Sequence, residues 1–142
     1  MATRASRAAA ATRRHPETGE MLHRRKRRVT VQYKGRKRSV EVEGWFPKDA
    51  KRDGVLVGKD MAPMDAALDD LKAEAARDMS RKIRKLREKA GLSQRRASQL
   101  LGGGPRAFQK YETGQVAPST AVINLLTLIA NDPSRLDELK RG

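Results

Sequence analysis

The sequence predicts an α+β fold, in which a small β module, a hairpin or three strands, precedes a domain of five helices. Between residues 29 and 42 apolar side chains alternate with polar ones, which is typical of half-buried strands. From residue 78 onward they recur every three or four positions, which is typical of helices. With 142 residues and 37% hydrophobic content, the chain can fill one modest core or two small ones.

The charge of the chain, +15, is concentrated at its two ends. Residues 1–28 hold nine Lys or Arg against two Glu, residues 29–77 ten against nine acids, and residues 78–142 thirteen against six. Such an excess of positive charge favours a polyanionic partner. Because there is no cysteine, disulfides and thiolate metal sites are excluded. No apolar run approaches the roughly 20 residues of a membrane span. We expect a cytoplasmic protein without cofactor, metal or membrane contact.

Residues 1–28 are expected to form a basic, disordered tail, because they show no apolar periodicity. The cluster from Arg24 to Arg28 either binds phosphates non-specifically or keeps the arm in solution.

Residues 29–59 are predicted to form the β module. Lys34-Gly35 supplies a turn between two strands, Trp45 and Phe46 are expected to cover the apolar face, and residues 55–57 are expected to add a short third strand. Residues 60–77 are predicted to form a connecting helix that begins at Asp60. Its acidic face either receives a basic protein partner or is simply solvated.

Residues 78–142 form the helical domain. A helix over 78–90 ends at Gly91, and Ser93 is expected to cap the next one. The run GGGP at 102–105 predicts a turn into a further helix that stops at Gly114. This is the layout of a helix-turn-helix, whose second helix offers side chains to base edges in the major groove.

Two more helices complete the domain. The helix over 119–130 is apolar on more than one side, which predicts a dimer contact through Ile123, Leu126 and Leu128. Asp132-Pro133 begins the last helix.

The run IRKLREKAGLSQRRASQLLGGGPRAFQKYETGQVAPS resembles the Xre-like helix-turn-helix of the MqsA family of antitoxins. The segments HPETGEML, VTVQYKGR and GVLVGKDM are also similar, so that the resemblance covers about residues 15–140. It implies a homodimeric repressor on a palindromic double-stranded operator, at the bacterial nucleoid. The repressor would be the antitoxin of a type II toxin–antitoxin system that autoregulates its operon and neutralises a protein toxin, with a ribonuclease as the expected toxin.

The family's N-terminal module, its toxin-binding part, often carries a four-cysteine zinc site. This chain has no cysteine, and His15 and His23 fall short of four ligands. We therefore expect no zinc here.

The resemblance also implies roles for single residues. Base contacts fall on Arg106 and Lys110, with Gln109 as a weaker candidate. Arg and Lys both suit guanine O6 and N7, so G·C pairs are expected. Phosphate contacts are expected from Ser93, Gln94, Arg95 and, ranked lower, Arg96. Glu112 is expected to form a structural ion pair with Arg87.

Other classes of protein fit less well. A free-standing helix-turn-helix autorepressor with no toxin partner is the alternative that stays open. An RNA-binding protein is disfavoured, because two Phe, one Trp and two Tyr, most needed in cores, leave no stacking platform. An enzyme with a small-molecule substrate is least expected: the sequence has no cysteine nucleophile, and GGGP lacks the Lys and Ser/Thr of a nucleotide loop.

Overall fold

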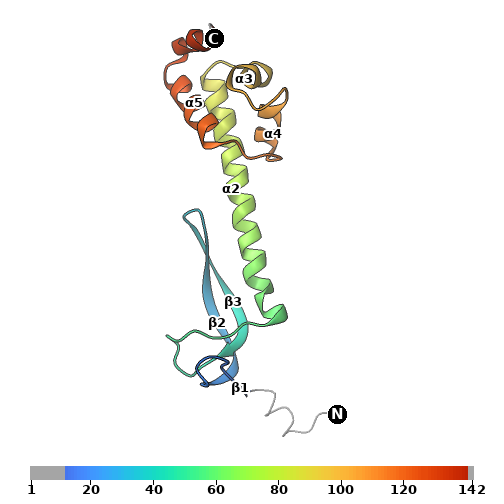
Figure 1. The fold of residues 1–142 in the computed structure, drawn as a ribbon, viewed down its shortest axis with the longest axis vertical. Helices are drawn as coiled ribbons and strands as arrows, with labels where there is room; N and C mark the ends of the chain where they lie inside the picture. Colours follow the sequence, from blue (N-terminus) through green and yellow to red (C-terminus); the bar gives the residue numbers. More distant parts are fainter. Residues whose placement is uncertain (1–11, 141–142) are drawn as a thin grey trace. The chain divides into compact units, whose positions relative to one another are not determined.

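The structure is a computed structural model that describes residues 12–140 (Figure 1). The elements follow in the order β1 (Thr12–Arg14), β2 (Met21–Tyr33), β3 (Arg36–Phe46), the 3₁₀ turn η1 (Gly58–Met61), α2 (Ala62–Lys89), α3 (Gln94–Leu101), α4 (Ala107–Thr113), α5 (Thr120–Asn131), the 3₁₀ turn η2 (Pro133–Arg135) and α6 (Leu136–Lys140). The predicted α+β class is confirmed. The chain divides into two compact units, one ending at Lys72 and one beginning at Ala73. Within the described residues, no helix is long and apolar enough to cross a membrane.

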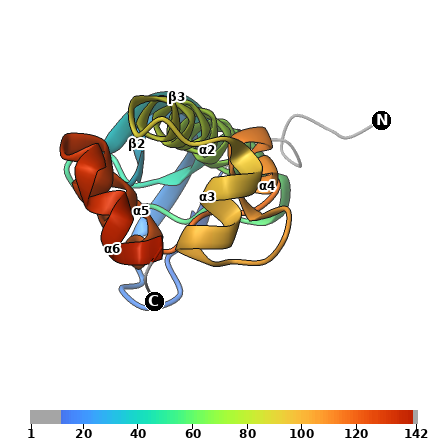
Figure 2. The same ribbon diagram turned by 90° about the horizontal axis from the view of Figure 1, so that it is seen from above.

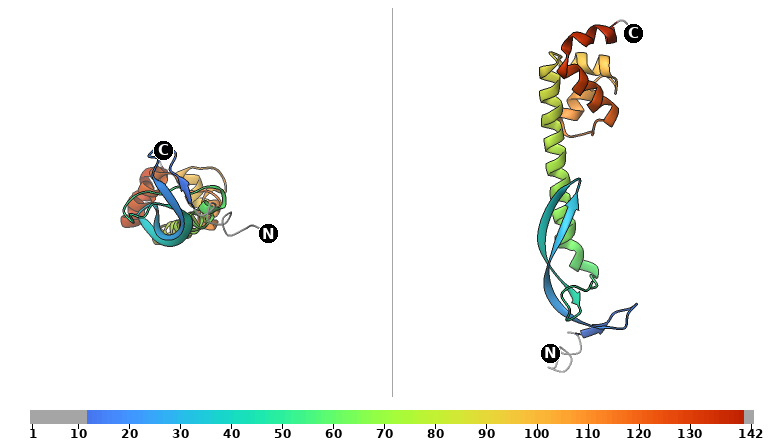
Figure 3. Two further views of the ribbon diagram at one scale, coloured as in Figure 1. Left: turned by 90° about the horizontal axis from the view of Figure 1, so that it is seen from below. Right: turned by 90° about the vertical axis from the view of Figure 1, so that its left-hand side faces the viewer.

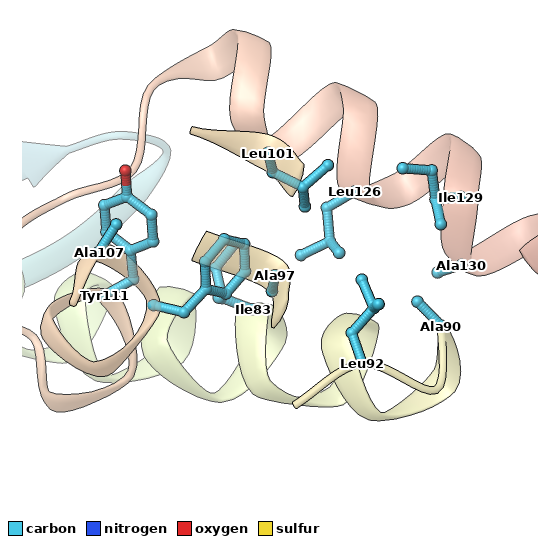
Figure 4. Packing of buried hydrophobic residues seen from close by; sticks show 11 residues of the cluster. Ile83, Ala90, Leu92, Ala97, Leu101, Ala107, Tyr111, Leu126, Ile129 and Ala130 are labelled. Atoms are coloured by element: carbon cyan, nitrogen blue, oxygen red, sulfur yellow. The ribbon is translucent and has the colours of Figure 1, made fainter. Parts of the chain in front are cut away.

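The helical unit encloses one apolar core. Viewed along α2, α3 and α4 lie together on one side of that helix, and α5 and α6 lie on the other (Figure 2). Ile83 of α2, Phe108 of α4 and Leu126 of α5 expose no surface. Figure 4 shows Ala97 and Leu101 of α3 facing the same centre. The rings of Phe108 and Tyr111 meet edge to face at 5.3 Å between centroids.

The burial of Leu126 corrects one predicted role. We expected this residue at a dimer contact, but it lies wholly inside the core of its own chain. Leu128, by contrast, is 56% exposed, and Ile123 is partly buried against the core. Helical periodicity shows that α5 is apolar on two sides, but it does not show which side faces the chain's own core.

The N-terminal unit is built on an antiparallel sheet in the order β1-β2-β3. The long β2–β3 hairpin turns at Lys34-Gly35, where both residues have positive φ, 46° and 77°. Its strands twist about each other (Figure 3). On the inner face, Val31 packs against Ala67 and Leu71 from the first turns of α2, and all three side chains are buried.

The expectation of a disordered tail over residues 1–28 is wrong from Thr12 onward; residues 1–11 lie outside the described part. β1 and β2 occupy residues 12–14 and 21–33, so the basic cluster lies within a strand. In the hairpin register Lys26 stands opposite Glu43 and Arg28 opposite Glu41. Opposite charges at such positions stabilise a strand pair. The partners lie more than ten residues away, so the local sequence shows only a charge run.

Two further boundaries differ from the prediction. The third strand of the sheet is β1, because residues 55–57 contribute only an isolated bridge between Val55 and Trp45. The expected helices over 60–77 and 78–90 form the single helix α2, and Asp60 lies in the turn before it. The sequence around residues 77 and 78 contains neither glycine nor proline, so nothing local ends the helix there.

Asp60 connects the turn η1 to the sheet. Its carboxylate accepts two hydrogen bonds from the Arg24 guanidinium, one of them 2.8 Å long, and a third from the Val57 amide at 3.0 Å. The Arg24 and Arg13 guanidinium groups each lie 5.5 Å from the centre of the Trp45 ring. The hydrogen bonds from Arg24, then that from Val57, lower the pKa of Asp60 from 3.8 to about 2.

This network predicts a pH-dependent stability of the N-terminal unit. Because the pKa of Asp60 is lowered on folding, its stabilisation is complete above pH 4 and is lost as pH falls toward 2. We therefore expect Asp60→Asn to lower the free energy of unfolding most above pH 4, and least at pH 2. Fluorescence of Trp45, the one tryptophan, during denaturant unfolding measures this. A constant difference between the two proteins from pH 2 to pH 6 would contradict the assignment.

Candidate nucleic-acid interface

A buried hydroxyl group joins α3 to α4. Ser98 Oγ donates to the Gln94 carbonyl at 2.8 Å and accepts the Phe108 amide at 3.1 Å. Phe108 lies in the first turn of α4, where backbone amides have no partner within the helix. Ser98 thus fixes the start of α4 against α3. We did not predict this role; the signal was a serine beside Ala97 in a short amphipathic helix.

The turn between the two helices needs glycine at Gly103. This residue has a φ of +97°, and a Cβ atom there would lie 2.6 Å from Tyr111 Oη and 2.9 Å from the Cβ of Ala107. The backbone of the turn therefore passes directly over α4. Gly104 has nearly the same φ, +99°, but a Cβ atom there would meet nothing within 4 Å beyond its chain neighbours.

The predicted partners Arg87 and Glu112 form a buried ion pair. Arg87 Nε lies 3.0 Å and Nη2 lies 2.8 Å from the Glu112 carboxylate, and the two side chains are 13% and 6% exposed. The remaining Nη1 donates to the Leu92 carbonyl at 2.8 Å. One guanidinium thus connects α2, the entrance to α3, and α4.

The exposed face of α4 carries the three predicted base-contact residues. Arg106 precedes the first turn of α4, and Gln109 and Lys110 follow it by three and four positions, so all three share one side of the helix. Arg106 and Gln109 also line a cleft of about 290 Å³ together with Gln94 and Arg95 of α3. The structure therefore brings two predicted base contacts and two predicted phosphate contacts to one exposed cleft.

The other predicted phosphate contacts lie differently. Ser93 Oγ accepts the Arg96 amide at 3.0 Å and so caps α3, which leaves its hydroxyl proton for a second partner. The Arg96 guanidinium donates to Gln99 at 3.3 Å and does not line the cleft.

Across residues 12–140, no three His, Asp or Glu side chains gather as metal ligands.

The helices α3 and α4, joined by the glycine turn, form a helix-turn-helix motif. The chain belongs to the MqsA family: the family model described as "Antitoxin component of bacterial toxin-antitoxin system, MqsA" matches residues 14–140. A similar curated protein is "Antitoxin MqsA" of Escherichia coli (strain K12), which is 40% identical over 58 residues. That match covers 41% of this chain and 44% of the relative, so it spans less than half the length of the protein it matches.

The close approach at Gly103 predicts a stability difference between neighbouring glycines. Gly103→Ala and Gly104→Ala both add a side chain at a φ near +98°, a strain of about 1–3 kcal/mol. Only Gly103→Ala also adds a clash with Tyr111 and Ala107, of roughly a further 1 kcal/mol. Thermal unfolding followed by circular dichroism should give Gly103→Ala the lower midpoint, whereas equal midpoints would contradict the close packing of the turn.

Proposed function

We propose that the chain is the antitoxin of a type II toxin–antitoxin pair and that it represses its own operon by reading DNA with α4. The observation that carries this proposal is the cleft in which Arg106 and Gln109 of the α4 face meet Gln94 and Arg95 from the start of α3. Membership of the antitoxin family supports the biological role.

In the proposed complex α4 enters the major groove. Arg106 and Lys110 donate hydrogen bonds to guanine O6 and N7, and Gln109 contacts a neighbouring base edge or a phosphate. At the start of α3, Ser93, Gln94 and Arg95 hold the backbone of one strand, which fixes the register of α4 on the duplex. Guanidinium groups suit this task because their planar donors match phosphate and guanine geometry.

The proposed repressor is a homodimer. Leu128 exposes 56% of its surface and borders an apolar cleft between α5 and α6, with Leu125, Ile129 and Leu139 also in its lining. Covering this cleft with a second copy would bury it and would present two α4 helices to a palindromic operator. The half-sites would then lie about one helical turn apart.

The toxin would be bound by the N-terminal unit and, following the family resemblance, would be a ribonuclease. Support for this part comes from the family match over residues 14–140. Co-expression with the neighbouring gene tests it, since a chain that regulates DNA alone would purify without a protein partner.

Reading by α4 predicts a specific effect of Arg106→Ala. The wild-type protein should prefer duplex DNA from just upstream of its own gene over a scrambled duplex. Arg106→Ala should lose roughly 1–3 kcal/mol of this discrimination, because one bidentate base contact is removed. Fluorescence anisotropy across a salt series measures both affinities.

Lys140→Ala is the matched control, since it also removes one exposed positive charge from the helical unit but lies in α6. It should keep the discrimination of the wild type. Equal binding of wild type to both duplexes, with no effect of Arg106→Ala, would refute sequence reading by α4.

The dimer proposal predicts that Leu128→Glu weakens self-association. A charge at the border of the covered cleft would be costly to bury without a partner. We expect sedimentation velocity to show wild-type dimers and Leu128→Glu monomers at the same micromolar concentration. Val116→Glu, at an apolar loop position that is 45% exposed, should stay dimeric. An unchanged dimer in the Leu128 variant would place the interface elsewhere.

A further inference from the structure

A second basic groove lies on the helical unit, along α2 and beside the end of α4. It has a volume of about 450 Å³. Small side chains line it at Ala73, Ala76 and Ser80, and three arginines of α2 also line it: Arg77, Arg81 and Arg84. We refer to it as the α2–α4 groove. None of these residues has a part in the cleft at the start of α4.

The exposed face of α4 leads into this groove. Thr113 follows Arg106 by seven positions, so it continues the side of the helix that carries Gln109 and Lys110. Thr113 and the following Gly114 also line the α2–α4 groove. The cleft with Gln94 and Arg95 therefore lies at the first turn of α4, and the α2–α4 groove lies at its last turn.

The length of α4 matches the spacing of DNA backbones. Seven residues of helix span about 10 Å, and the major groove of B-DNA is about 12 Å wide. If α4 crosses the groove instead of running along it, a helix of this length ends near a sugar–phosphate backbone on each side. The start of α3 serves one backbone, and the arginines of α2 are placed for the other.

The arginines of the groove are available to an anion. Arg81 pairs with Asp78 at 2.6 Å and Arg84 with Glu88 at 3.0 Å, but both arginine side chains are about two-thirds exposed, at 68% and 67%. Exposed pairs of this kind contribute little to stability. A phosphate can therefore take the place of the carboxylate at little cost.

The Glu112 carboxylate and two carbonyls at the end of α4 already have hydrogen-bond partners. The Glu112 carboxylate, which lines the groove, is bound by Arg87. At the end of α4 the Tyr111 carbonyl accepts the Ser80 hydroxyl at 2.8 Å, and the Lys110 carbonyl accepts the Gln115 amide at 3.0 Å. These bonds reduce the repulsion that the C-terminal end of a helix would offer to an anion.

We propose that the α2–α4 groove binds the sugar–phosphate backbone of duplex DNA on the side of the major groove opposite to α3, with Arg77 and Arg84 contacting phosphates. The proposal rests on the proposed reading of DNA by α4 and extends it to a second strand. Because these contacts touch no base, they add affinity without sequence preference. The small side chains of the groove permit close approach of the backbone.

The test compares two double variants of α2 that remove equal charge. Arg77→Ala/Arg84→Ala removes two guanidinium groups from the groove. Lys82→Ala/Lys85→Ala removes two from the neighbouring side of the same helix, where both lysines line a different groove. Each protein is titrated with the upstream duplex and with the scrambled duplex across a salt series, after circular dichroism has shown that both variants fold.

The arginine variant should bind both duplexes more weakly, by the same factor. Its slope of log K against log salt should be shallower by about 1.8, because roughly 0.9 is lost for each phosphate contact removed from B-DNA. The lysine variant should change this slope by less than half as much. Neutral methylphosphonates placed only in the strand opposite to the one that α3 contacts should weaken the wild type and leave the arginine variant unaffected.

The outcomes separate this proposal from the proposed function. If the wild type prefers the upstream duplex but the two double variants behave alike, the groove proposal is overturned and reading by α4 stands. If the wild type shows no preference for the upstream duplex, yet only the arginine variant has a shallower salt slope, sequence reading by α4 fails while the groove remains a backbone site. If the arginine variant keeps its DNA affinity but loses a co-purified protein, an acidic protein occupies the groove and the proposal is wrong.

Discussion

The buried pair of Arg87 and Glu112 is the constraint on which the helical unit depends. Every guanidinium nitrogen of Arg87 is used, two on the carboxylate and one on the Leu92 carbonyl, so a single side chain sets α2, the entrance to α3 and α4 against one another. A buried pair contributes little net stability compared with apolar packing, but removal of one partner leaves an uncompensated charge. The Arg87–Glu112 pair instead fixes orientation, because it holds the exposed face of α4 in one direction relative to α2.

Local rules were sufficient to predict the helix-turn-helix. Ser93 as a cap, the glycine run and Gly114 as a stop all follow from the backbone chemistry of single residues, and the structure shows the cap on the Arg96 amide and a left-handed Gly114. The pairing of Arg87 with Glu112 followed from the family resemblance. Local rules do not predict the role of Ser98, because its partner, the Phe108 amide, lies ten residues away across the turn.

The N-terminal unit was harder to predict because its strands are held together by distant partners. A run of arginines carries no apolar alternation, so residues 24–28 looked like a solvated arm. In the folded unit Arg24 is bound by Asp60, 36 positions later, and its guanidinium lies over Trp45. The same limit applies to Leu126, whose burial depends on how α5 packs against Ile83 and Phe108, and not on its own sequence neighbourhood.

The proposed division of labour explains why so basic a chain could still be selective. Positive charge alone attracts any duplex, and its contribution is the same for every sequence. Selectivity needs side chains held at base edges, the role that we propose for Arg106 and Lys110 on α4. If backbone contacts are made by α3 on one side and by the arginines of α2 on the other, α4 is positioned by groups that do not contact bases. Substitutions on α4 can then alter which operator sequence is read, while the contacts of Arg77 and Arg84 maintain the affinity for DNA.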